Sequence, residues 1–496
     1  MLENILLGMQ SAFSLGNIAA LVFGAFVGIV VGIVPGIGPM VGMVVLLPFT
    51  FVLTPEKALS LLLGIFCGGY YGGGIPAVLM RTPGVPSSLI TSFDGFPLTQ
   101  KGEAQRGLSA ALMGSFAGGI ISVFILIFLA PLLAHVAASF GPPEYFSAAL
   151  FGVVLVVMAY RERLSQGLLL LGLGLWFSTV GIDGPTLCPR FCFGMWSLQN
   201  GLHIVPVCLG LFGIGQTLIL VEKQILQSES MSLTRRTLDF TKLLETFRYW
   251  KTMIKAGVIG TFVGLLPGTG SILASFMSYE AAKRTSKHPE EFGKGTPEGC
   301  LASEGGNNAV PAGAMIPLLT LGIPGDALSA VLLGVFTING IYPGPLLLLK
   351  EPVLINTLYF SMLLINLAAF LMLALWLRPF AMIVRVNSSI LAIVIMVISV
   401  VGIYAVNTRV FDAVVAIVMG VLGYILLRLK WPIVNLVMGV ILGEILEQRL
   451  RESLSLGDGN PIIFLTRPIS VGLLVAAALI IVIPLLMDRR RRNRPA

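Results

Sequence analysis

Two copies of one glycine- and proline-rich phrase constrain this chain more than any other feature. They are VGIVPGIGP at residues 31–39 and VGLLPGTGS at residues 263–271. Small residues precede each phrase at intervals of four, so one helix face lacks bulky side chains and a neighbouring helix can approach closely. Pro-Gly-x-Gly then ends the helix, because proline lacks a backbone donor and glycine tolerates unusual dihedral angles. The sequence therefore predicts two broken, closely packed helices.

The composition indicates that the broken helices lie in a membrane. Hydrophobic residues make up 56% of the 496 residues and charged ones only 11%, whereas soluble domains carry roughly 25% charged residues. Residues 107–143 contain no Asp, Glu, Lys or Arg, and a spanning helix needs only roughly 20 apolar residues. Helix breaks at membrane depth are tolerated where protein or a water-filled cavity receives the freed backbone groups. We predict an all-α polytopic membrane protein with about 10–12 spans.

Basic residues indicate the orientation in the membrane. The formal net charge is +8, and five arginines between residues 489 and 494 lie directly after the apolar run 468–487. The positive-inside rule places such a cluster in the cytoplasm. We therefore interpret the basic balance as topology and not as nucleic-acid binding, and we expect a multi-pass protein of the cell inner membrane.

A second break is also duplicated, which predicts two repeats. The pairs IP at 75–76 and PG at 83–84 recur 241 residues later, at 316–317 and 324–325. Glycine and proline are so dense between residues 64 and 88 that we expect no single regular helix there. Duplicated broken helices with short re-entrant segments are typical of inverted-repeat transporters. The expected units are a first transmembrane repeat (1–222), a cytoplasmic linker (223–252), a second repeat (253–447), and a C-terminal span with a basic tail (448–496).

The duplicated breaks are the candidate substrate site. Half-helix N-termini offer backbone N–H groups to an anion, while unwound carbonyls coordinate a cation. The alternative is that glycine and proline only allow kinks and close packing, but two breaks duplicated in register favour function. The residues assigned to substrate are Gly36, Gly38, Arg81, Pro83, Gly84, Ser87, Ser88, Gly268, Thr269, Gly270, Ser271, Asn307, Asn308, Pro324 and Gly325.

A smaller set could bind a cation. Asn307 and Asn308 follow Glu304 beside long apolar sequence, which is typical of an ion or substrate path but also of helix-to-helix hydrogen bonding. The Thr269 hydroxyl could bind sodium or satisfy the kink. Asp326 could be a cation ligand or proton carrier, although capping of a helix N-terminus is the simpler interpretation. The candidate metal ligands are Thr269, Asn307, Asn308 and Asp326.

Arg81 has two interpretations. It precedes the break at 82–84, where its guanidinium could hold a substrate carboxylate bidentately. It could instead extend to the membrane surface, as long basic side chains do. Motifs typical of enzymes, such as HExxH, GxSxG and the P-loop, are missing from the sequence, so no enzyme activity is expected.

The combination of motifs resembles the large membrane subunit, the TctA-like permease, of the tripartite tricarboxylate transporter family. The resemblance extends over nearly the full length and implies a bacterial permease that works with a small membrane subunit and a periplasmic solute-binding protein. Asp326 and Arg81 depart from residues usual in the family, which leaves the substrate open. The segments that carry the resemblance are 34–39, 71–88, 93–98, 179–194, 265–271, 278–299, 302–309 and 320–325.

We therefore expect a secondary active, ion-coupled importer of small organic anions, either tricarboxylates or other carboxylates. The resemblance implies an ion gradient as the driving force, with sodium or a proton as coupling cation and no other cofactor. Two alternatives stay open: a polytopic membrane enzyme or scaffold, and a passive anion channel.

Overall fold

The structure, a computed structural model, describes residues 2–34, 38–137, 139–222, 238–268, 270–344, 346–383, 396 and 409–492. Gly36 and Thr269 lie outside these described residues, as does the apolar segment 388–405 apart from residue 396. The described chain is helical except for one two-stranded antiparallel hairpin. We call residues 1–222 the first half and residues 238–447 the second half.

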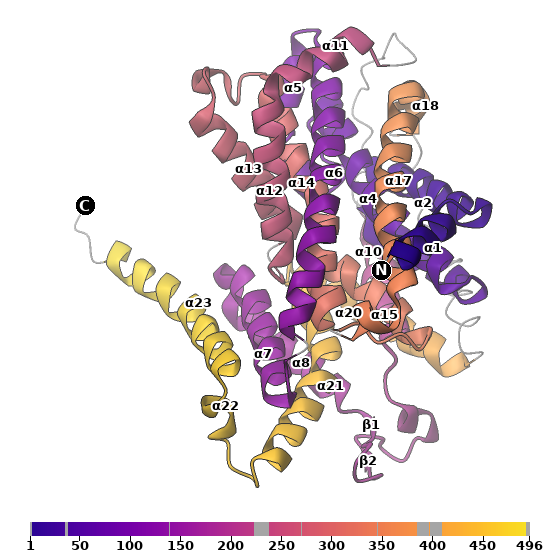
Figure 1. Ribbon diagram of the computed structural model, residues 1–496, viewed down its shortest axis with the longest axis vertical. Helices are drawn as coiled ribbons and strands as arrows, with labels where there is room; N and C mark the ends of the chain where they lie inside the picture. The colour runs from indigo at the N-terminus through magenta and orange to yellow at the C-terminus, as the bar shows by residue number, and fades with distance from the viewer. Residues whose placement is uncertain are drawn as a thin grey trace.

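The first half contains the elements that Figure 1 draws from indigo to magenta. They are α1 (Leu2–Ala12), α2 (Leu15–Ile33), α3 (Gly38–Leu46), η1 (Leu47–Val52), α4 (Pro55–Met80), η2 (Pro86–Leu89), α5 (Ser92–Gln100), α6 (Ala104–Ala137), α7 (Pro142–Ala159), η3 (Arg161–Arg163), α8 (Leu164–Ser178), β1 (Gly181–Ile182), β2 (Pro189–Arg190), η4 (Trp196–Asn200), α9 (Ile204–Cys208), the π-helical η5 (Leu209–Ile214) and α10 (Gly215–Glu222).

The second half and the C-terminal segment follow. They comprise α11 (Phe240–Glu245), η6 (Thr246–Tyr249), α12 (Trp250–Leu265), α13 (Gly270–Thr285), η7 (Pro289–Glu291), α14 (Pro297–Leu321), α15 (Ala327–Ile338), α16 (Leu347–Lys350), α17 (Pro352–Leu375), α18 (Leu377–Ile383), α20 (Val410–Arg428), α21 (Ile433–Leu456), α22 (Ile463–Thr466) and α23 (Pro468–Arg492).

Fewer helices qualify as full spans than the sequence predicted. In the described chain, five helices are long and apolar enough to cross a membrane, namely α2, α4, α6, α17 and α20. The bent pair formed by α7 and α8 raises the number to six. The others fall short because breaks divide them, as at α3, or because polar side chains lower their hydropathy, as along α14. The molecule is a helical membrane protein in which many segments are half-spans.

Residues 64–88 do not form a single regular helix, as the sequence predicted: α4 ends at Met80, and the chain breaks before η2 begins at Pro86. Up to that break α4 is continuous from Pro55, with Pro76 inside it. Its glycines are accommodated because α2 packs against them backbone to backbone. A Cβ added at Gly68 would lie 2.4 Å from the carbonyl oxygen of Ala25, and one at Gly32 would lie 2.1 Å from that of Gly69. Tertiary packing thus outweighs the low helix propensity of glycine.

The same packing recurs in the second half, where α12 lies against α14. A Cβ added at Gly260 would lie 2.3 Å from the carbonyl oxygen of Gly306. The helix α6 approaches α14 as closely, because a Cβ at Gly118 of α6 would lie 2.0 Å from the carbonyl oxygen of Gly305. The helices α4 and α14 are buried along almost their whole length, so they form the centre of the molecule.

The polar segment 94–106 holds most of α5 and the start of α6. Asp94 on α5 is fully buried and accepts hydrogen bonds from the backbone N–H groups of Gly293, Gly295 and Thr296 at 2.8–3.1 Å. It also accepts one from the Tyr279 hydroxyl at 2.9 Å. This clasp brings the C-terminal end of α4 and the N-terminal end of α14 to the same end of the molecule, at the top of Figure 1.

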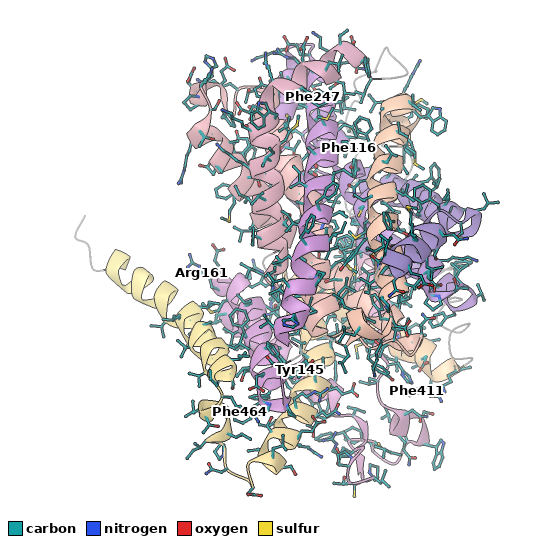
Figure 2. The ribbon with its side chains drawn as sticks, viewed as in Figure 1. Phe116, Tyr145, Arg161, Phe247, Phe411 and Phe464 are labelled. Carbon is teal, nitrogen blue, oxygen red and sulfur yellow. The ribbon has the colours of Figure 1, made fainter. Side chains whose placement is uncertain are left out.

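Aromatic contacts attach the outer helices to this centre. Phe116 on α6 packs against Phe370 on α17, with ring centroids 4.7 Å apart. At the other end, Phe464 on α22 packs against Phe146 on α7 at 4.9 Å. Figure 2 shows Phe116 and Phe464 far apart along the long axis. The helices α7, α8, α20 and α21 form a second apolar core below the first.

Candidate functional site

In each half, the segment that follows a break packs against a segment of the other half. The helix α3, which follows the first break of the first half, packs against α15, which follows the second break of the second half. In the same way α13 of the second half packs against η2 of the first half. Each half therefore packs the segment after its first break against the segment after the other half's second break.

Within each half the two breaks also touch. The Gly268 N–H donates to the carbonyl oxygen of Gly325 at 2.8 Å, and a Cβ at Gly325 would lie 2.9 Å from the Gly264 carbonyl oxygen. In the first half, a Cβ at Gly84 would lie 1.9 Å from the Gly32 carbonyl oxygen, the equivalent pair. Pro83 and Pro324 precede these two glycines. No side chain larger than hydrogen fits at these contacts.

Positive φ angles distinguish the glycines at the first breaks. Gly38 and Gly270 have equivalent positions, with φ of 69° and 70°, and a Cβ at either would meet nothing within 4 Å. Gly268, with φ of 80°, instead faces Val156 of α7, whose Cα would lie 2.5 Å from an added Cβ. Open space thus adjoins the first residue of both α3 and α13.

A tyrosine from the first half contacts both breaks of the second half, at Ser271 and Asp326, which together are called the second-half break below. The Tyr70 hydroxyl on α4 is within hydrogen-bonding reach of Ser271 and close to the Asp326 carboxylate. Asp326 caps α15, because its side chain accepts from the Ser329 N–H at 2.8 Å and from the Ser329 hydroxyl at 2.7 Å. The capping interpretation of Asp326 agrees with this geometry, and its role as a cation ligand stays a prediction.

A buried polar cluster surrounds Glu304 on α14. Its carboxylate accepts a hydrogen bond from the Thr91 hydroxyl at 2.7 Å and from the side-chain amides of Asn307 and Asn308 at 3.1 and 3.2 Å. The Ser88 hydroxyl lies near the same carboxylate, but its oxygen is buried without a hydrogen-bond partner. All five side chains are at least nine-tenths buried, and Glu304 is 0% exposed. The structure therefore brings together the predicted residues of the two halves around a carboxylate.

This Glu304 cluster and the second-half break lie one helical turn apart. On α4, Tyr70 reaches the break, while a Cβ at Gly74 would lie 3.1 Å from Glu304 Oε1. On α13, Ser271 lies at the break, and Ser275 donates to the Ser303 carbonyl oxygen at 2.9 Å. A turn of helix advances by about 5.4 Å. An ion at one place and an anion at the other would share the same two helices.

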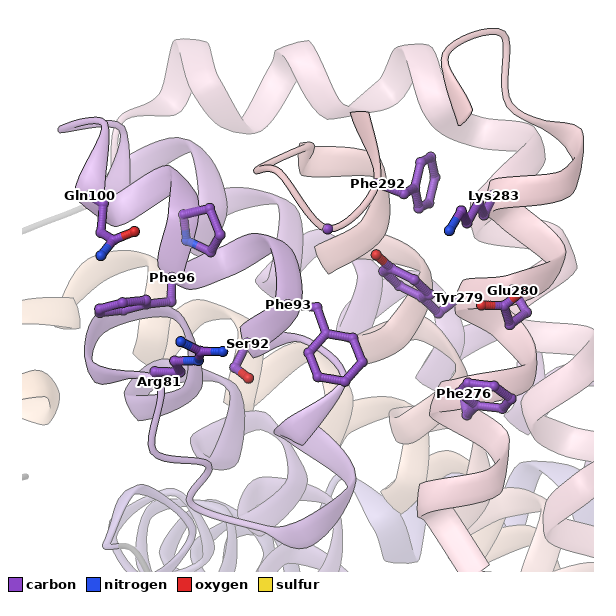
Figure 3. A pocket seen from close by; sticks show the side chains of 12 residues that line it. Arg81, Ser92, Phe93, Phe96, Gln100, Phe276, Tyr279, Glu280, Lys283 and Phe292 are labelled. Carbon is purple, nitrogen blue, oxygen red and sulfur yellow. The ribbon is translucent and has the colours of Figure 1, made fainter. Parts of the chain in front are cut away.

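Arg81 lies elsewhere, in a cavity of about 490 Å³ at the end that carries α5. Figure 3 shows it beside Phe96 on one wall, with Glu280 and Lys283 on the facing wall. Its backbone is left-handed, with φ of 57°, at the position where the second half has Gly322 with φ of 72°. The structure does not place Arg81 beside Glu304 or the second-half break.

Three residues that complete these sites were not predicted as ligands. Thr91 follows the first-half break by only a few residues, but nothing in the sequence indicates that it faces α14. Tyr70 lies within a glycine-rich stretch, where a large polar side chain is itself a signal. Glu304 was noted only as a neighbour of the asparagines. Ser87 is fully buried and its hydroxyl has no hydrogen-bond partner.

Fold and site together define a class of protein: a membrane protein with duplicated broken helices that meet around buried polar groups. The model of the tripartite tricarboxylate transporter TctA family matches residues 18–438. The chain belongs to that family, and it is therefore a component of a tricarboxylate transporter with partner subunits. The family consists of transporter components and not of enzymes.

Two proteins of Agrobacterium vitis are similar to this chain. One, described as an uncharacterized 52.8 kDa protein in the TAR-I ttuC' 3' region, is 35% identical over 498 residues, covering 99% of this chain and 98% of the relative. The other, an uncharacterized protein in the TAR-II ttuC' 3' region, is 35% identical over 238 residues, covering 47% of this chain and 97% of the relative. No solved structure matches the chain.

Proposed function

We propose that this chain is the permease of a secondary active importer that takes up small organic anions, of the tricarboxylate class or related carboxylates, together with a cation. The observation that carries this proposal is that one turn of α4 meets the second-half break at Tyr70, Glu304 at Gly74, and the first-half break at Gly73, whose carbonyl oxygen accepts from the Gly84 N–H at 3.2 Å. Family membership supplies the transporter class. A small membrane subunit and a periplasmic solute-binding protein complete the system in the bacterial inner membrane.

The anion binds at the start of α13. A helix N-terminus carries unpaired N–H groups and a positive dipole end, which favour a carboxylate. Open space adjoins Gly270, and the hydroxyls of Ser271 and Tyr70 flank it. The start of α15 is less suited to an external anion, because the Asp326 carboxylate already caps it.

The cavity around Arg81 and Lys283 is the cytoplasmic exit for the anion. Two cationic side chains on facing walls would attract a carboxylate leaving the membrane interior. The aromatic rings of Phe93, Phe96 and Phe292 line the same cavity. Arg81 thus acts on the substrate at the exit and not at the breaks.

The two halves act as inverted repeats. The Asp94 clasp at the shared end of α4 and α14 supports this arrangement, because α4 ends there and α14 begins there. Within each half, α2 runs parallel to α4 and α12 runs parallel to α14. Inverted repeats permit alternating access by rocking of one half against the other around a fixed site.

The test is uptake into proteoliposomes that contain the permease and its small membrane subunit, with the binding protein added outside. Labelled tricarboxylate should accumulate above its external concentration and leak out when the cation gradient is collapsed. Equilibration without accumulation would indicate a passive channel. If no ligand of the cognate binding protein is taken up, the importer proposal is wrong, and a scaffold or a membrane enzyme becomes the better interpretation.

A further inference from the structure

We propose that Glu304, Asn307, Asn308, Thr91 and Ser88 form a sodium-binding site. This inference rests on the proposed function, because it identifies the coupling cation and the residues that bind it. The cluster joins both halves, with Thr91 and Ser88 from the first and the other three from α14.

The first argument is the uncompensated carboxylate. Glu304 is 0% exposed and surrounded by fully buried helix on both sides. No Lys, Arg or His in the described residues forms an ion pair with it. Burial of a lone charge is very costly, so buried charges are paired or coordinate cations. A bound cation would supply the missing positive charge.

The second argument is the pair of unsatisfied amide oxygens. The Asn307 nitrogen donates to the Glu304 carboxylate, and the Asn308 nitrogen donates to that carboxylate, to the Glu304 carbonyl oxygen and to the Ser115 hydroxyl. The Oδ1 atom of each asparagine is buried without a hydrogen-bond partner. Rotation of each amide by half a turn exchanges its nitrogen and oxygen without changing the shape of the side chain. The two oxygens would then face the carboxylate and bind a cation held against it.

The donor set fits sodium. Hard cations take oxygen ligands, and carboxylate, amide and hydroxyl oxygens all belong to this class. The described residues contain no group of three or more His, Cys, Asp or Glu side chains suited to a metal, so the charge here is too low for a typical divalent site. One carboxylate balances one monovalent cation. A single proton on Glu304 could donate to only one amide oxygen and would leave the other without a partner.

The position of the cluster explains how the cation can favour anion binding. One turn of α4 and one turn of α13 separate it from the second-half break. A cation here draws Thr91 and Ser88 of the first half towards α14. The same approach of the first half to the second half holds Tyr70 against Ser271 at the anion site. The cation and the anion are therefore each bound better when the other is present.

The experiment measures sodium binding directly on the full-length purified permease, without transport. Thermal unfolding is followed while sodium chloride replaces choline chloride at constant ionic strength, and binding of radioactive sodium is measured in parallel. We expect saturable stabilisation by sodium in the wild type. Glu304→Gln should weaken the apparent sodium affinity about tenfold or more. The control is Glu144→Gln, which alters a buried carboxylate that caps α7 and should leave sodium binding unchanged.

A second pair of variants covers the case in which Glu304→Gln does not fold. Asn307→Ala should weaken sodium binding severalfold, whereas Asn366→Ala, at a buried asparagine of α17, should not. Absence of sodium binding in the wild type, or stabilisation by acid in place of sodium, would overturn the sodium site. Transport itself could still be coupled to protons, so this result would not contradict the proposed importer.

Discussion

Gly268 and Gly270 lie two residues apart, yet a side chain at each would meet different surroundings. Both have positive φ angles, which cost other residues about 1–2 kcal/mol. Only Gly268 also faces a backbone atom at clashing distance, in Val156. Gly268 is therefore needed for close packing and for its positive φ angle, whereas Gly270 is needed for its positive φ angle alone and adjoins open space.

We predict that Gly268→Ala lowers the melting temperature more than Gly270→Ala does, because overpacking adds about 1–3 kcal/mol to the conformational cost. Gly270→Ala should fold and yet reduce uptake, since it disturbs the start of α13. Gly172→Ala is the control, because Gly172 has an ordinary φ angle and open space around it. Wild-type uptake by a well-expressed Gly270→Ala protein would contradict the anion site.

Arg81 allows stability and function to be separated in one variant. Arg81→Gly removes the left-handed strain and reproduces the residue of the second half, Gly322. We expect an equal or higher melting temperature together with weaker apparent substrate affinity. Arg81→Lys, which lacks the bidentate fork, should weaken the affinity by about 1–3 kcal/mol. If both variants keep the affinity within about twofold, Arg81 is not a substrate ligand.

At the scale of elements, the Asp94 clasp joins α5 to the segment before α14. Asp94→Asn keeps the size of the side chain but removes the charge that accepts three backbone hydrogen bonds. Hydrogen bonds to charged groups contribute about 1.5–3 kcal/mol each. We predict a lower melting temperature, with Asp458→Asn at an exposed position as the control. An unchanged melting temperature would show that the clasp is not stabilising.

A second electrostatic contact lies at the opposite end, in the β1–β2 hairpin. Hydrogen bonds from Thr186 and the neighbouring Arg451 hold the pKa of the Asp183 carboxyl below its ordinary value. A carboxyl with a lowered pKa stabilises the folded state above pH 3.8, and this stabilisation is lost as the pH falls through the lower folded value. Hydrogen exchange of the hairpin should therefore accelerate at acid pH relative to the core, and Asp183→Asn should abolish this pH dependence.

The sequence predicted the helix ends better than the helix interiors. Ile33, Met80, Leu265 and Leu321 end their helices at or near the expected breaks, because Pro-Gly acts locally. The sequence indicated the break after α4 but not how regular α4 is before that break, since this regularity depends on the backbone of α2, which local sequence does not encode. The Glu304 cluster was found only in part for the same reason. Thr91 and Glu304 are 213 residues apart.

At the scale of the whole molecule, the basic loops indicate which end faces the cytoplasm. Lys101, Arg106, Lys287 and Lys294 lie in or beside the α5–α6 and α13–α14 connections, where Lys101 contacts Lys294 and Arg106 contacts Glu245 of α11. The positive-inside rule assigns this end, with α5 and α11, to the cytoplasm. In a protein without its native cysteines, we predict that Lys287→Cys is labelled only from inside and Trp196→Cys, at an exposed position of η4, only from outside. Labelling of both from one side would contradict this topology and the proposed inversion.

The central position of α14 also has a consequence for biosynthesis. Chains are made at roughly 5–20 residues per second, so α14 enters the membrane on the order of ten seconds or more after α4. Until then α4 packs against α2, while Thr91 and Ser88 lack the Glu304 carboxylate that they lie beside in the complete protein. A chain that stops before α14 leaves these hydroxyls and the glycine-rich face of α4 without their partner. Such an unfinished product differs from the complete protein at its centre, where α14 would otherwise bury the glycine-rich face of α4.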